Sequence, residues 1–132
     1  MDGEWSRSKI LQWERMNIPE KPIPEFPLTY KTPWFPMATR AKLGVGIQKE
    51  LEKEIGPLHP LFPFHPVAFA KSGQSDDILA VLNDGRFAFV HLVWHGHIDS
   101  MPTKFPVSSI VNTLDAVQAE IDRAAAEYLA DE

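Results

Sequence analysis

The run from Asp76 to Trp94, "DDILAVLNDGRFAFVHLVW", constrains the fold most strongly. Two apolar segments, Ile78–Leu82 and Arg86–Trp94, flank Asn83-Asp84-Gly85, which is typical of a β-hairpin turn because Asn and Gly tolerate positive φ. Successive side chains of a strand point to opposite faces, and the second segment is apolar on both. We therefore expect that strand to lie inside a sheet that is covered on both faces.

Further segments predict two more strands and two helices. Strands are expected at Val67–Lys71 and at the β-branched Val107–Val111. Apolar residues at every fourth position predict a helix over 38–55, with Thr39 as its N-cap and Gly56-Pro57 as its end.

Asn112 is predicted to cap a long C-terminal helix, whose apolar stripe packs on the sheet or, alternatively, binds a partner helix. The order of elements predicts an α+β fold, a small antiparallel sheet of three or four strands with helices packed on it. The length of 132 residues fits a single domain over 1–132.

The N-terminal third is rich in proline and lacks the strand and long-helix patterns of the rest of the chain. Residues 5–16 predict a short helix capped by Ser6, which either docks on the domain or frays. Residues 17–37 hold six of the twelve prolines, which favour an extended backbone. Large apolar side chains lie between these prolines, so we interpret the segment as a strap across the domain surface. The alternative is a docking peptide for a groove of another protein.

Composition excludes several classes of protein. The chain has no cysteine, which removes disulfides, thiolate nucleophiles and iron–sulfur ligation and fits the cytoplasm. A net charge of −5 without a basic stripe argues against nucleic-acid binding. No apolar run approaches the ~18 residues that span a bilayer, so we expect no membrane association.

Three of the five histidines gather at the end of the predicted third strand. If the strand continues through Gly96, His95 and His97 share a face about 6–7 Å apart, a spacing that suits zinc or iron. His91 lies on that face about 13 Å away. The candidates for a third ligand are Asp99, His65, Asp76 and Asp77. The same histidines can instead act in acid–base catalysis without metal, or have no role beyond structure.

In the structural interpretation, His91 is a half-buried strand residue that forms a hydrogen bond with a neighbour, and His95 and His97 lie on an exposed loop. Asp76-Asp77 has two interpretations as well. The paired carboxylates can bind a cation, or they can accept backbone hydrogen bonds in the turn before a strand.

Short motifs between Leu58 and Trp94 resemble a family of small bacterial proteins of uncharacterised function. The resemblance rests on "HPLF" at 59–62, Asp-Asp at 76–77, Asp-Gly at 84–85 and "VHLVW" at 90–94. Relatives of that kind usually carry Ser after the Trp, where this chain has His95. The resemblance implies no activity, and it speaks against a His95–His97 metal site as a family property.

We predict a small cytoplasmic binding or interaction module without a cofactor, whose partner is another protein or a second copy of the chain. Aromatic residues outside the regular elements favour an interface. These interface candidates are Tyr30, Trp34, Phe35, Phe62 and Phe64. The acidic charge would suit neutralisation of a basic toxin. The alternative is a metal-dependent or histidine-based enzyme centred on His91, His95 and His97, with Asp99 nearby; the sequence assigns no catalytic residue.

Overall fold

A computed structural model describes residues 23–94 and 96–130. The predicted helix over 5–16, residues 17–22 of the proline-rich segment and His95 lie outside the described residues. Within them, no helix is long and apolar enough to cross a bilayer.

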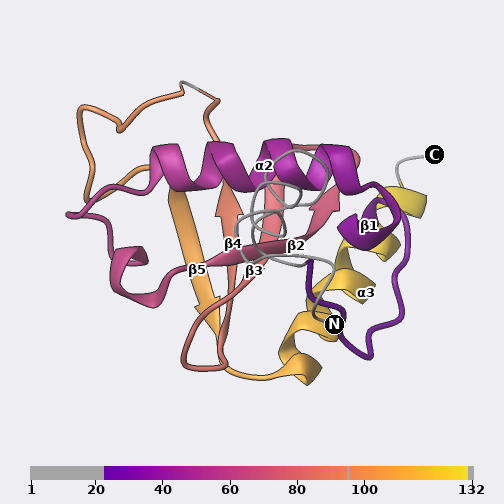
Figure 1. Cartoon of the computed structure of the whole chain (residues 1–132). Coiled ribbons are helices and arrows are strands. Elements are labelled where there is room, and N and C mark those ends of the chain that lie inside the picture. The colour runs from indigo at the N-terminus through magenta and orange to yellow at the C-terminus, as the bar shows by residue number, and fades with distance from the viewer. Residues whose placement is uncertain (1–22, 95, 131–132) are drawn as a thin grey trace, which may run out of the picture.

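In the described part of the chain, five antiparallel strands form one sheet in the order β1-β2-β3-β4-β5 (Figure 1). The strands are β1 (Trp34–Pro36), β2 (Val67–Ser72), β3 (Asp77–Val81), β4 (Phe87–His91) and β5 (Val107–Val111). The α+β fold with an antiparallel sheet is confirmed, but the sheet has five strands rather than three or four. The additional strand is β1, which pairs Trp34 with Ser72 and Phe35 with Lys71. Pro36 fits there because an edge strand can do without one N–H donor.

Among residues 23–94 and 96–130, one α-helix packs on each face of the sheet. Helix α2 (Ala41–Glu54) buries Ile47 and Leu51 in a core that includes Ala88 and Val90 of β4. Helix α3 (Leu114–Ala130) buries Val117 and Ile121 in a second core on the opposite face, with Phe69, Leu79 and Phe87. The two sets of β4 side chains alternate along the strand, as the period of two requires. The prediction that this strand is covered on both faces is therefore confirmed.

The two helix starts differ from the prediction. A 3₁₀ helix, η1 (Met37–Thr39), precedes α2, and the hydroxyl of Thr39 donates to the carbonyl of Pro36 rather than capping α2. At α3 the cap is Thr113 and not Asn112, because Thr113 Oγ1 accepts a hydrogen bond from the N–H of Ala116 at 3.1 Å. Both neighbours are good capping types, so the sequence could not decide between them.

The described part of the proline-rich segment packs against the α3 side of the sheet. The Phe26 ring lies 4.7 Å from the Phe69 ring and 5.3 Å from the Phe87 ring, both edge-on. The backbone of Thr29 exchanges two hydrogen bonds, of 2.8 and 2.9 Å, with the Gln118 side chain on α3. The large side chains of this segment, such as Phe26, thus pack against the domain itself.

The hairpin turn between β3 and β4 is confirmed. Gly85 has φ +91°, and its N–H donates to the carbonyl of Leu82 at 3.0 Å. A Cβ at this position would be strained, which explains why the turn uses glycine.

Candidate functional site

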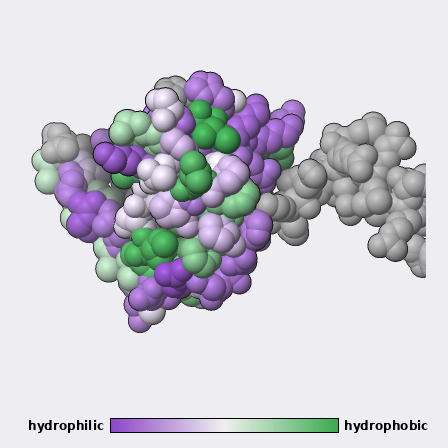
Figure 2. Space-filling view, turned by 90° about the vertical axis from the view of Figure 1, so that its left-hand side faces the viewer, coloured by the Kyte–Doolittle hydropathy of each residue, from purple (hydrophilic) through white to green (hydrophobic). Residues whose placement is uncertain are grey.

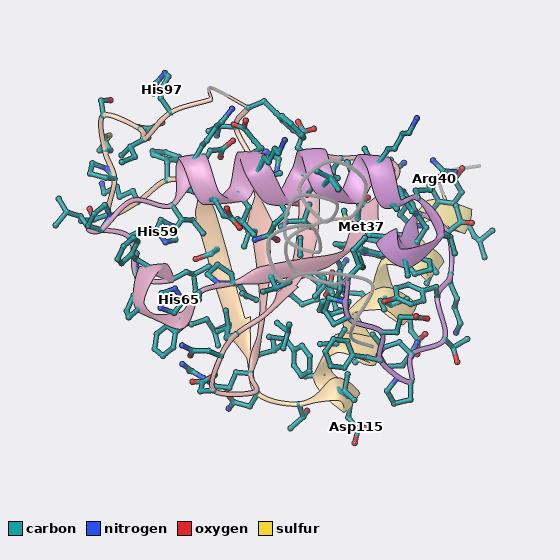
Figure 3. The ribbon with its side chains drawn as sticks, viewed as in Figure 1. Met37, Arg40, His59, His65, His97 and Asp115 are labelled. Atoms are coloured by element: carbon teal, nitrogen blue, oxygen red, sulfur yellow. The ribbon has the colours of Figure 1, made fainter. Side chains whose placement is uncertain are left out.

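The predicted histidine cluster is not on a strand. Strand β4 ends at His91, and positive φ values at Trp94 (60°) and Gly96 (74°) turn the chain into a loop over 92–106. His97 lies in this loop, where its Nδ1 is 2.8 Å from the carbonyl of Ile98. Figure 3 shows His97 at the outer end of the loop, away from His59 and His65. Asp99 stabilises the loop by accepting the N–H of Met101 at 2.9 Å.

Among residues 23–94 and 96–130, no three His, Asp or Glu side chains come together as metal ligands. His95, one of the two predicted zinc or iron ligands, lies outside that part of the chain. Among the described residues, the structure thus does not join His91, His97 and Asp99 into a metal site.

His91 forms a pair with Asp77, its direct cross-strand neighbour on β3. His91 Nδ1 lies 2.9 Å from Asp77 Oδ1, and the Ser75 hydroxyl donates to Asp77 Oδ2 at 2.7 Å. The expected hydrogen bond exists, and the His91 side chain is 51% exposed. The reason is that the α3-side core extends along β4 only as far as Phe89.

The pair has a defined chemical capability. A carboxylate at Nδ1 favours the tautomer with a proton on that nitrogen, which leaves Nε2 as an acceptor. Asp77 is therefore more than the turn residue or cation ligand that the sequence suggested. It begins β3 and orients an imidazole beside a surface hollow.

That hollow, which we call the α3 hollow, lies between α3 and strands β3 to β5 and has a volume of about 560 Å³. Its lining residues are Asp77, Phe89, Ser109, Val111, Ala116, Ala119, Glu120 and Arg123. Arg123 pairs with Glu120 and also with Glu127 one turn further along the helix. Glu120 accordingly raises the pKa of the Arg123 guanidinium. Helix α3 carries four carboxylates and one guanidinium, and Lys31 pairs with Asp122 at 2.8 Å, so carboxylates still outnumber cations on this side of the molecule.

Strand β5 forms an edge of the sheet next to the α3 hollow. The N–H of Leu82 donates to the Arg86 carbonyl, and the N–H of Leu92 donates to the Asp76 carbonyl. The backbone N–H and C=O groups of the even-numbered residues of β4 thus form hydrogen bonds with β3. In an antiparallel ladder, successive residues of a strand direct these groups to opposite sides. The odd-numbered residues of β4 therefore form their hydrogen bonds with β5.

The register pairs Phe89 with Ser109, so Val107, Ser109 and Val111 bond to β4. The backbone N–H and C=O groups of Ser108 and Ile110 then point outward. Among the described residues, no hydrogen bond reaches either from that side.

Buried polar side chains form hydrogen bonds with the backbone at both ends of the 92–106 loop. At its start, the Glu54 carboxylate, on a residue only 1% exposed, accepts the N–H groups of Val93 at 2.9 Å and Trp94 at 2.7 Å. Glu50 accepts the N–H of Gly96 at 2.9 Å. Burial, followed by the hydrogen bond with Glu50, raises the pKa of Glu54 to about 7, although the two N–H donors oppose the rise.

At the end of the loop, His59 has the corresponding role. Its Nε2 lies 2.7 Å from the carbonyl of Pro106 and its Nδ1 accepts the N–H of Leu61 at 3.0 Å. Between the two anchors, Ile98 packs on Gly56, where an added Cβ would come within 2.6 Å of Ile98 Cδ1. Sequence reasoning missed Glu50, Glu54 and His59 as anchors. The one available signal was the His-Pro-Leu motif.

The aromatic interface candidates are mostly used for packing. Trp34 is 6% exposed and belongs to the α3-side core, so its side chain is used for packing within the domain. Tyr30 and Phe64 are partly buried against the two cores, and the Phe35 ring lies under the Arg40 guanidinium at 4.7 Å. Phe62 alone of the five is among the exposed large side chains.

No protein-family model matches the chain, and the comparisons with curated proteins and with solved structures give no match. The resemblance to a small bacterial family stays a prediction.

Proposed function

We propose that the protein is a cytoplasmic protein-binding module and that its docking surface is the outer edge of β5. The observation that carries the proposal is the pair of outward-facing residues Ser108 and Ile110, whose backbone donors and acceptors have no partner among the described residues. Such an edge can accept an extended segment of another protein as an added strand. A chain without cysteine needs no oxidising compartment, which supports the cytoplasm.

The composition of β5 supports this assignment. Edge strands are usually protected by charged residues, by proline or by being very short. The other edge, β1, follows that rule, since it has three residues and ends in Pro36. Strand β5, "VSSIV", has five residues with no charge and no proline, and Val107 and Ile110 are 54% and 38% exposed.

We include in the proposed surface the exposed apolar side chains of the loop that leads into β5 and of the segment after α2. Trp94, Ile98 and Met101 in the 92–106 loop are each about half exposed, and Leu58 lies exposed in the segment that follows α2. Figure 2 looks onto the side of the molecule where β5 lies and shows separate hydrophobic patches among paler and hydrophilic residues. A backbone edge surrounded by small apolar contacts fits a partner that binds as a strand.

Site-specific photo-crosslinking in the native host tests the proposal. A benzophenone amino acid at Ile110 should give a discrete cross-linked species, and Ser108→Pro, which removes one outward N–H, should abolish it. The control position is Leu129, which is exposed at the far end of α3. Equal yields of adduct at 110 and 129, or none at 110, would contradict docking at β5.

The competing proposal is a histidine-based or metal-dependent enzyme. The Asp77–His91 pair beside the α3 hollow favours it, because an oriented imidazole can act as a general base. Metal analysis of untagged protein is the discriminating experiment for the metal-dependent form. Stoichiometric zinc or iron that is lost in a His95→Ala/His97→Ala double variant would replace the binding proposal.

A further inference from the structure

We infer that the occupant of the β5 edge is an extended basic segment of another protein, which pairs with β5 as a sixth strand and places a Lys or Arg side chain at the α3 hollow. This inference rests on the proposed function, and it adds the chemistry of the partner.

The geometry connects the edge to the hollow. Ser109 and Val111 belong to β5 and also line the α3 hollow, together with Glu120 and Arg123 of α3. Directly opposed residues of neighbouring strands point to the same face of a sheet, with the strands about 4.8 Å apart. A partner residue opposite Ser109 therefore directs its side chain to the α3 face, at the mouth of the hollow. Residues on either side of it point to the α2 face.

The carboxylates around the mouth of the α3 hollow favour a positively charged side chain of the partner. Asp77 and Glu120 line the α3 hollow, and Glu127 lines a second hollow of about 300 Å³ that also contains Asp77, Glu120 and Arg123. These three carboxylates outnumber the one guanidinium of Arg123 that faces them. The whole chain has a net charge of −5. Exposed ion pairs contribute little each, so backbone pairing supplies the affinity and the carboxylates supply the preference for a basic partner.

A second copy of the chain fits less well. In such a dimer, a two-fold axis would pass through Ser109 perpendicular to the sheet and would pair Ser108 with Ile110 of the other copy. The outward backbone N–H and C=O groups of both strands would then form hydrogen bonds with one another. The same axis keeps like faces together, so the two α3 helices would lie on one side of the joined sheet. Each of them carries four carboxylates and one guanidinium. Like charges in such an arrangement oppose pairing, whereas a basic segment relieves them.

Fluorescence anisotropy with defined peptides tests the inference. The probe is a labelled nine-residue peptide that alternates Lys with Val or Thr, so that all its lysines share one face of a strand. One matched peptide has Glu in place of every Lys. Another keeps the side chains but has N-methyl groups on alternate backbone nitrogens. We expect the Lys peptide to bind with an affinity that falls as salt rises, and we expect neither control peptide to bind comparably.

Matched charge reversals on the protein distinguish the effect of a charge at the α3 hollow from the effect of the net charge of the protein. Glu120→Lys should weaken binding of the Lys peptide about fivefold, and Glu120→Gln should weaken it less. Glu52→Lys makes the same change of charge at an exposed position of α2, on the opposite face of the sheet. It should weaken binding of the Lys peptide less than Glu120→Lys does. Melting temperatures establish that each variant is folded.

The outcomes distinguish the two proposals. Equal binding of the Lys and Glu peptides, or equal effects of Glu120→Lys and Glu52→Lys, would overturn the basic partner. If the Ile110 adduct still forms, docking at β5 stands. A cross-link between two copies would assign the edge to self-association and also overturn the inference. Binding of the Lys peptide that is insensitive to Ser108→Pro and to backbone methylation would place the peptide elsewhere and contradict both proposals.

Discussion

The buried carboxylate of Glu54 makes stability depend on pH in a direction opposite to that of an ordinary surface acid. Its pKa is raised from an ordinary value of 4.5 to about 7, first by burial and then by Glu50. The folded state therefore holds the proton more tightly than the unfolded state does. The stabilisation is fully present below pH 4.5 and is lost as the pH rises towards and through about 7.

The magnitude follows from the rise in pKa. A rise from 4.5 to about 7 corresponds to at most about 3 kcal/mol of unfolding free energy. Glu50 shares the proton, so we expect a loss on the order of 1–3 kcal/mol between pH 4.5 and pH 8. Glu54→Gln should remove most of this slope, because an amide does not titrate. The variant should also lose about 1 kcal/mol at acidic pH, since one N–H acceptor becomes a donor.

Urea unfolding followed by tryptophan fluorescence at pH 5, 6, 7 and 8 measures both effects. The matched control is Glu52→Gln, on the same helix but exposed, where the carboxylate accepts a hydrogen bond from the Gln48 side chain at 2.7 Å. This control should keep the wild-type slope. A Glu54→Gln protein whose stability changes with pH as steeply as the wild type does would refute the assignment of the slope to Glu54.

Three further substitutions test the turn and the loop anchors. Gly85→Val should destabilise the protein by more than about 1 kcal/mol because of the φ of +91°, and an unchanged urea midpoint would contradict the turn geometry. His59→Leu leaves the Pro106 carbonyl and the Leu61 N–H without their partner, and we expect a loss of about 2–4 kcal/mol in the same assay; a loss below 1 kcal/mol would show that His59 is no anchor. Gly56→Ala should displace Ile98 and speed amide exchange in the 92–106 loop, whereas unaltered exchange would show that the contact can relax.

Local patterns predicted the centre of the sheet well. The alternation on both faces of β4, the Gly85 turn and the bounds of β5 could be read from neighbouring residues, because strand period and turn chemistry are local properties. Strand β1 could not be read in this way. Its Pro36 argues against a strand unless β2 is known to have a free edge, because a strand that pairs there can do without one N–H donor.

The site depended on contacts that are distant in sequence. His91 was correctly placed on the face of Phe87 and Phe89, but its exposure is set by where the α3-side core ends, which the strand pattern does not encode. Glu54 resembled a solvated helix residue, and its partners Val93 and Trp94 lie about forty positions away. The outward groups of β5 likewise follow from the ladder as a whole and not from the segment "VSSIV" itself.

Amide hydrogen exchange at β5, measured by NMR with and without the Lys peptide, tests the proposed docking most directly. Ser108 and Ile110 have outward-facing N–H groups, whereas Val107 and Ser109 already bond to β4. The account predicts that the peptide slows exchange selectively at Ser108 and Ile110, and that the Ser108→Pro variant shows no such protection at Ile110. Protection that is absent at both residues under saturating peptide, or equal along the whole strand, would contradict the addition of a sixth strand at this edge.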